Sequence, residues 1–70
     1  MKTKFKNYEA IYIHEKDNKI DKITSMGCDF AAEALRRFKE SKTANKMILY
    51  VATHNNTRLK IHAEYGMEYK

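Results

Sequence analysis

Three histidines and one cysteine are the side chains of this chain best suited to acid–base, nucleophilic or metal chemistry: His14, His54, His62 and Cys28. No HxxxH or HExxH spacing joins the histidines, so a metal site would need ligands gathered from separate segments. A helix expected after Cys28 could lower the pKa of its thiol, but the sequence offers no base or second cysteine to work with it. We therefore expect no metal and no cofactor, and interpret Cys28 as a packing residue.

Basic side chains gather on the last strand-like segment, where Arg58, Lys60 and His62 precede Tyr65. Such residues on an exposed sheet can perform acid–base chemistry on RNA. Strict alternation, however, places Lys60 and His62 on one face of a strand and Tyr65 on the other. A small ribonuclease is therefore the weakest alternative, and we expect a protein without catalytic residues.

The charge balance favours an anionic partner. The chain has 14 Lys and Arg against nine Asp and Glu, a net charge of +5 and a pI near 9.4. This favours nucleic acid or an acidic protein surface, although a lysine-rich solubilising surface fits equally well. Arg36 and Arg37 could contact phosphates or pair with nearby glutamates of their helix. The expected partner- or nucleic-acid-binding residues are Arg36, Arg37, Arg58, Lys60 and His62.

Seventy residues, of which 43% are hydrophobic, predict a single domain over residues 1–70 with a small core. Small domains often need a staple, and a lone cysteine leaves oligomerisation as the available one. The basic start of the chain has no apolar run behind it, and no segment reaches membrane-spanning length. Together with one unpaired cysteine, this predicts a soluble, cytoplasmic protein without membrane contact.

The segment Asp29–Glu40, DFAAEALRRFKE, predicts an amphipathic helix around which the rest must be arranged. Its apolar residues fall at helical spacing on one face: Phe30, Ala31, Ala34, Leu35 and Phe38. Asp29 is the expected N-cap, because its carboxylate can accept hydrogen bonds from the free amides of the first turn.

Four segments rich in β-branched and aromatic residues predict strands: Phe5–Glu15, Ile20–Met26, Lys46–Thr53 and Arg58–Tyr65. Polar turn residues separate the members of each pair, at Asp17-Asn18 and at Asn55-Asn56. The order β-β-α-β-β predicts an α+β fold, a four-stranded, mainly antiparallel sheet with one helix packed on one face.

Two-residue turns would fix the register of both hairpins. In the first hairpin, Tyr12 would pair with Ile23, and Ile13 with Lys22. In the second, the expected pairs are Ile48 with Ala63, Tyr50 with Ile61, and Ala52 with Leu59. We place this second set under the helix, and a loop one residue longer would reverse that assignment.

One helix leaves the other side of the sheet uncovered. With the register above, that side carries Met47, Leu49 and Val51, with Ile11 and Ile13 as further candidates. Contiguous exposed apolar surface usually marks an interface, whereas long lysine and arginine stems could also cover it. We therefore expect Met47, Leu49 and Val51 to form an interface rimmed by basic residues.

A helix of the AAEALRRFKE kind, followed by a hairpin such as KMILYVATHNNTRLKIHAEY, resembles the layout of several phage-encoded anti-CRISPR proteins. The resemblance covers nearly the full chain as architecture and assigns no role to any residue. It implies a protein that binds the RNA-guided complex of the host and occludes its nucleic-acid channel.

The sequence thus predicts a non-enzymatic binding protein of phage or prophage origin. It would inhibit a host nucleic-acid machine by stoichiometric contact, with a host protein or ribonucleoprotein complex as its partner. Direct binding of RNA or DNA is one alternative, and a structural homodimer formed through the open sheet face is another.

Overall fold

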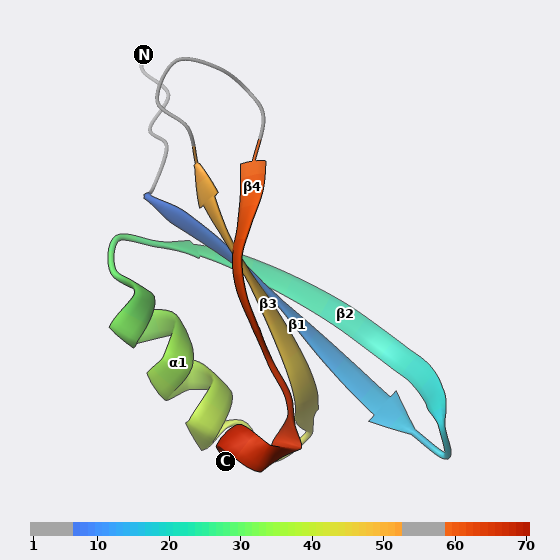
Figure 1. Cartoon of the computed structure of the whole chain (residues 1–70). Helices are drawn as coiled ribbons and strands as arrows, with labels where there is room; N and C mark the ends of the chain where they lie inside the picture. The colour runs from blue at the N-terminus through green and yellow to red at the C-terminus, as the bar shows by residue number, and fades with distance from the viewer. Residues whose placement is uncertain (1–6, 53–58) are drawn as a thin grey trace.

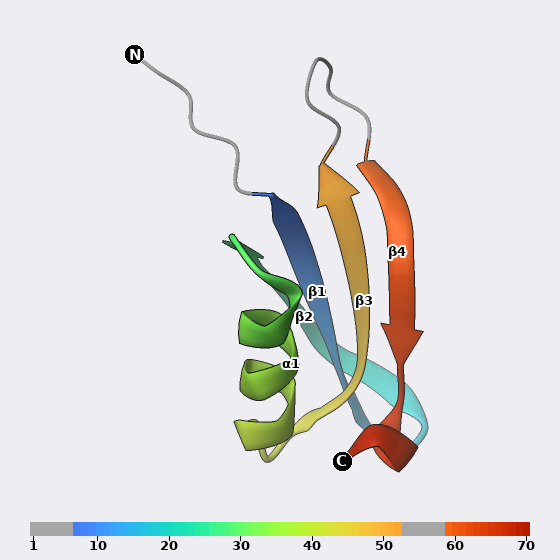
Figure 2. The same ribbon diagram turned by 60° about the vertical axis from the view of Figure 1, so that its left-hand side comes forward.

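The fold was analysed in a computed structural model, which describes residues 7–52 and 59–70. The elements are β1 (Tyr8–Lys16), β2 (Lys19–Cys28), α1 (Ala31–Glu40), β3 (Ala44–Ala52), β4 (Leu59–Tyr65) and a short 3-10 helix, η1 (Met67–Tyr69). The four strands form one antiparallel sheet in the order β2-β1-β3-β4 (Figure 1). Figure 2 shows α1 on one side of these strands. The expected α+β fold is confirmed.

The first hairpin turns where the sequence predicts it. Asp17 and Asn18 both have positive φ, 55° and 64°, as a two-residue turn of the mirror-image type requires. A bulge at Asp21 then shifts the register, because Glu15 lies opposite Ile20 whereas His14 lies opposite Lys22. The two expected pairs are therefore wrong by one residue.

The pairs observed in their place are Tyr12 with Thr24 and Ile13 with Ile23. Ile13 and Ile23 consequently share a face, on which Ile11 and Ile20 also lie.

The second hairpin carries a bulge as well. Tyr50 pairs with Ile61 and Ala52 with Leu59, as expected, whereas Asn55-Asn56 lie outside the described residues. Beyond these pairs one extra residue, His62, interrupts the ladder, so Ile48 lies opposite Glu64 and not opposite Ala63. Because of this extra residue, Ile61 and Ala63 lie on opposite faces of the sheet, whereas strict alternation would place them on the same face.

Helix α1 begins one residue later than predicted, with Phe30 in place of Asp29 at its N-cap position. The Glu33 side chain caps the helix by reaching back, since its Oε1 accepts from the backbone N–H groups of Asp29 (3.0 Å) and Phe30 (3.4 Å). Asp29 is therefore not the cap. Phe30 is 66% exposed and does not join the core.

The core lies between α1 and strands β1 and β3. Ala34 and Phe38 of the helix are fully buried, and the buried sheet residues beneath include Ala10, Tyr12, Met47 and Leu49. The Tyr12 hydroxyl donates a hydrogen bond to the Ala34 carbonyl oxygen at 3.3 Å, which fixes the helix to the sheet.

Helix α1 packs on the side of the sheet opposite to the expected one. Met47 and Leu49 lie across from Tyr12 and Ala10 on β1, and together they form the layer that the helix covers. Small alanines in this contact, Ala10 and Ala34, let the helix approach the strands closely. The set containing Ile48 and Tyr50 therefore faces away from α1.

The end of the described chain closes the core beside α1 (Figure 1). The Tyr69 ring stacks on that of Phe38 with centroids 6.5 Å apart and an angle of 25° between the ring planes, and Tyr65 meets Tyr69 edge-on at 5.0 Å. The Lys70 ammonium lies 4.7 Å from the Phe38 ring centroid and donates to the carbonyl oxygens of Ser41 (2.5 Å) and Ala44 (2.9 Å).

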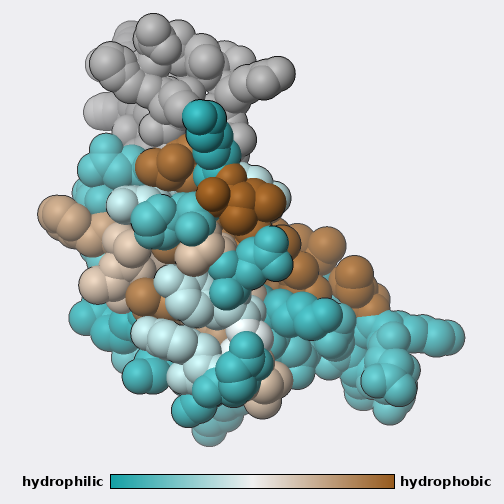
Figure 3. Space-filling model, viewed as in Figure 1, coloured by the Kyte–Doolittle hydropathy of each residue, from teal (hydrophilic) through white to brown (hydrophobic). Residues whose placement is uncertain are grey.

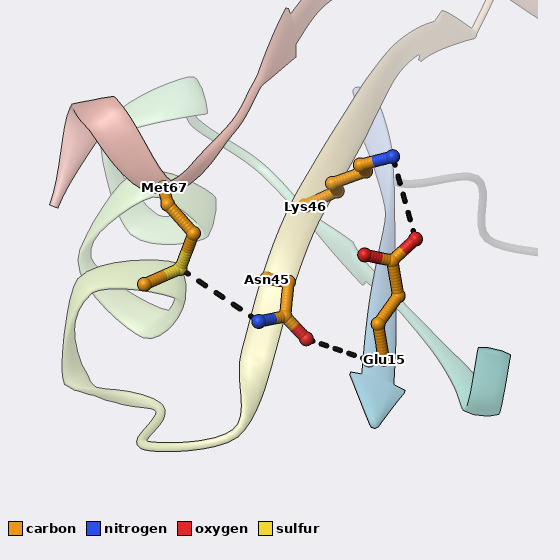
Figure 4. Close-up of polar contacts among 4 residues, drawn as sticks. All are labelled: Glu15, Asn45, Lys46 and Met67. Carbon is orange, nitrogen blue, oxygen red and sulfur yellow. Dashed lines mark hydrogen bonds and ion pairs between the residues drawn. The ribbon is translucent and has the colours of Figure 1, made fainter. Parts of the chain in front are cut away.

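Asn45 ties three elements together at the start of β3 (Figure 4). Its Oδ1 accepts a hydrogen bond from the Glu15 backbone N–H at 2.6 Å, and its Nδ2 lies 3.8 Å from the Met67 sulfur. The same figure shows Lys46 paired with the Glu15 carboxylate at 3.3 Å.

Candidate interaction surface on the open side of the sheet

The side of the sheet opposite α1 carries a row of isoleucines, which we call the isoleucine face. Its apolar residues, placed by strand register, are Ile11, Ile13, Ile20, Ile23, Ile48, Tyr50 and Ile61. Ile20, Ile23 and Ile61 are more than half exposed, and the other four are partly buried by their neighbours. Figure 3 shows hydrophobic side chains in a band from β4 along β2.

The charged residues of this face are mainly acidic. Glu9 lies between Gly27 and Tyr50 in its row of the sheet, and Glu64 lies opposite Ile48. Glu15 and Lys46 share the face and pair with each other at 3.3 Å. The expected basic rim is therefore wrong for this side of the sheet, because three carboxylates and one ammonium group accompany the isoleucines.

Two of the three predicted interface residues are buried. Met47 and Leu49 have no exposed surface, because they lie beneath α1. Val51 belongs to the same side, opposite Tyr8 on β1 and Lys60 on β4, and is partly buried. Strand β3 therefore presents Ile48 and Tyr50, and not Met47 and Leu49, to the open side, where the further candidates Ile11 and Ile13 also lie.

The basic residues expected to bind a partner lie away from the isoleucine face. Arg36 and Arg37 are exposed on α1, and Lys60 lies opposite Val51 on the side that carries the helix. His62 is exposed, and its ring meets that of Tyr8 edge-on with centroids 5.4 Å apart. Arg58 lies outside the described residues. The structure thus brings none of the four described residues onto the isoleucine face.

Much of the positive excess of the chain belongs to residues outside the described segments. Four of its 14 Lys and Arg residues fall outside the described segments: Lys2, Lys4, Lys6 and Arg58. All nine acidic residues fall inside them. The surface formed by residues 7–52 and 59–70 is therefore nearly balanced in charge, and it offers little electrostatic attraction for a nucleic acid.

His14 is the one histidine with a buried side chain among the described residues. Its Nδ1 lies 2.9 Å from the Thr43 hydroxyl and its Nε2 3.4 Å from that of Thr24. A hollow of about 380 Å³ lies beside it, lined in part by Lys42 and Asp21. Since a hydroxyl can donate or accept, both ring nitrogens are satisfied, and the interaction is structural.

Cys28 behaves as the packing residue that the sequence predicts. The side chain is buried, and this burial raises the pKa of its thiol, helped by the nearby Glu33 carboxylate and opposed by Arg37. Within the described segments, no group of three His, Cys, Asp or Glu residues could hold a metal ion.

The pKa of Tyr12 is raised, like that of Cys28. Burial raises the pKa of its hydroxyl, and the Arg37 guanidinium beside it acts the other way. Arg37 is therefore placed next to the core tyrosine, which its position in the sequence did not indicate.

The raised pKa values of Cys28 and Tyr12 predict that the folded protein loses stability at alkaline pH. The unfolded chain releases their protons near pH 8.5 and 10, whereas the folded chain holds them to higher pH. The contribution of these two groups to the free energy of unfolding is thus complete below about pH 8, and it is lost as the pH rises above that value. Urea midpoints should be lower at pH 10 than at pH 7, and less so in the double variant Cys28→Ala, Tyr12→Phe. An equal drop in that variant would contradict this origin.

No helix in the described part of the chain is long and apolar enough to cross a membrane. No protein-family model, curated protein or solved structure matches this chain.

Proposed function

We propose that this protein is a non-enzymatic binding protein, and that it acts by stoichiometric contact through the isoleucine face. The observation that carries the proposal is the continuity of that face, where apolar residues from all four strands lie side by side with no helix over them in the described structure. Apolar patches of this kind are typical of protein interaction sites.

The charged residues of the isoleucine face indicate the chemistry of the partner that it would bind. Glu9 and Glu64 flank Ile11, Ile48 and Tyr50 without a lysine or arginine within salt-bridge distance among the described residues. A protein surface that combines apolar side chains with lysine or arginine would satisfy both features. A nucleic-acid strand would meet these carboxylates with its phosphates, which is unfavourable.

The fuller form of the proposal is an inhibitor of a host nucleic-acid machine, encoded by a phage and directed at a host protein or ribonucleoprotein complex. Its support is the architectural resemblance to anti-CRISPR proteins and the small, lysine-rich chain. With the isoleucine face as the contact, such an inhibitor would bind a protein component of the machine.

The role of the isoleucine face is tested by immobilising the wild-type protein and two matched variants and comparing the host proteins that each retains. Ile48→Lys places a charge at its centre, and Ala32→Lys places the same charge on the exposed surface of α1. We expect a host protein retained by the wild type and by Ala32→Lys to be lost with Ile48→Lys, while circular dichroism shows all three folded. Retention by a folded Ile48→Lys variant would remove the proposal.

Direct binding of RNA or DNA is the competing proposal, and it would use the other side of the sheet. Arg36, Arg37 and Lys60 are exposed there. It requires an affinity for single-stranded RNA that falls with salt at a log–log slope of about −0.7 per phosphate contact, and that is lost in Arg36→Glu, Arg37→Glu. Gel shifts without binding at low salt would dismiss it.

A further inference from the structure

Strand β2 forms one edge of the sheet, and it is exposed along almost its whole length. Eight consecutive residues, 19–26, are exposed. Such an edge presents unpaired backbone N–H and C=O groups that can pair with another strand.

Exposed apolar side chains gather on both sides of this edge. Ile20 and Ile23 are 58% and 56% exposed on the isoleucine face, whereas Met26 is 47% exposed on the side of α1, opposite Ala10. Phe30, two residues after the end of β2, is 66% exposed. A partner on one face of the sheet would cover only half of this set, but a strand added along the edge would cover both halves.

The two halves of β2 differ in how they are protected from pairing. Lys19, Lys22 and the bulge at Asp21 interrupt the first half, and charges and bulges are the usual protection of edge strands. The second half, Ile23–Cys28, contains no charge, no proline and no bulge.

The opposite edge, β4, is protected by a bulge at His62 and by exposed Lys60 and Glu64. The unprotected backbone of the sheet therefore lies in the second half of β2.

We propose that this half of β2 pairs antiparallel with the same segment of a second copy of the chain, joining two sheets into one of eight strands. A two-fold axis at Ser25 would bring that residue against its counterpart, with Thr24 facing the partner's Met26 and Ile23 facing the partner's Gly27. No charged residue then lies directly opposite a like charge, which self-pairing requires. The dimer extends the isoleucine face and leaves it uncovered, so this proposal does not depend on the function proposed above.

Sedimentation of the wild-type protein over a range of concentrations tests the pairing directly. We expect a reversible monomer–dimer equilibrium. Met26→Lys should raise the dimer dissociation constant roughly tenfold to a hundredfold, because both protomers lose an apolar contact at the edge. Ile48→Lys, which alters the face but not the edge, should leave the dimer intact.

Hydrogen exchange of the wild type gives a second reading that needs no variant. Amides in 23–28 should exchange more slowly at high than at low protein concentration. A monomer at every concentration up to about 1 mM would overturn the proposal. So would a dimer that Ile48→Lys dissociates and Met26→Lys does not, because that result would place the contact on the isoleucine face.

Discussion

Leu49→Lys is expected to unfold this protein, whereas the same substitution at the neighbouring residue, Ile48→Lys, should leave it folded. Leu49 has no exposed surface and lies in the core beneath α1. Lysine there loses about 1.5–3 kcal/mol of apolar burial and leaves a charge without a partner. The sum approaches the whole stability of a small domain, about 4–10 kcal/mol at this length.

Ile48 differs because it points to the isoleucine face, where a lysine can extend its charge into water. We expect a cost of about 1 kcal/mol or less at that position. Urea titrations followed by circular dichroism compare the two variants directly. An unfolded Ile48→Lys beside a folded Leu49→Lys would show that the helix covers the other side.

Phe38→Ala should remove about 3–5 kcal/mol of unfolding free energy, the second large effect. Phe38 is fully buried, faces the sheet from α1 and contacts both Tyr69 and Lys70 at the end of the described chain. Its removal would open a cavity and loosen η1 at the same time. The urea midpoint of the variant measures the loss.

Phe30→Ala is the matched control, since it deletes the same side chain eight residues earlier in the chain. Phe30 is 66% exposed, so we expect a change within about 0.5 kcal/mol in the monomer. Equal losses in the two variants would contradict the position of α1 on the sheet.

The fold class could be read from the sequence because its signals are local. The spacing of Ala31, Ala34 and Phe38 defines the helix, and Asp17-Asn18 defines the first turn by its tolerance of positive φ. The helix cap was predicted one position away because two acidic residues compete for it, and Glu33 reaches back where Asp29 could have capped.

The side of the sheet covered by α1 could not be read in the same way. Strand β3 is apolar on both sides, so alternation alone does not distinguish Met47 and Leu49 from Ile48 and Tyr50. The deciding residues lie on β1, where Ala10 and Tyr12 form the helix contact, and no local signal links them to β3. An unpredicted bulge at His62 then moved Ala63 to the other face.

The sequence predicted a sheet covered by a helix on one side only, with Ile11 and Ile13 among the candidates for the open side, and both lie there in the described structure. The residues of β3 on that side and its acidic charge were not predicted. The expected basic rim was misplaced because α1 covers the side on which Lys60 lies opposite Val51, and the bulge at His62 brings Glu64 to the isoleucine face. The acidic flank comes from Glu9 and Glu64, two residues on strands that are not neighbours in the sheet. Only the strand order shows that both border the isoleucines of the central strands.

Thiol labelling of two native variants, each with one added cysteine, tests most directly the central claim that the isoleucine face is the outward side of the sheet. Cys28 is buried and should react slowly, so it can remain in place or be replaced by alanine. We predict that Ile48→Cys is modified readily and that Leu49→Cys reacts only after denaturation. Protection of the cysteine at position 48, together with ready labelling at position 49, would contradict the account.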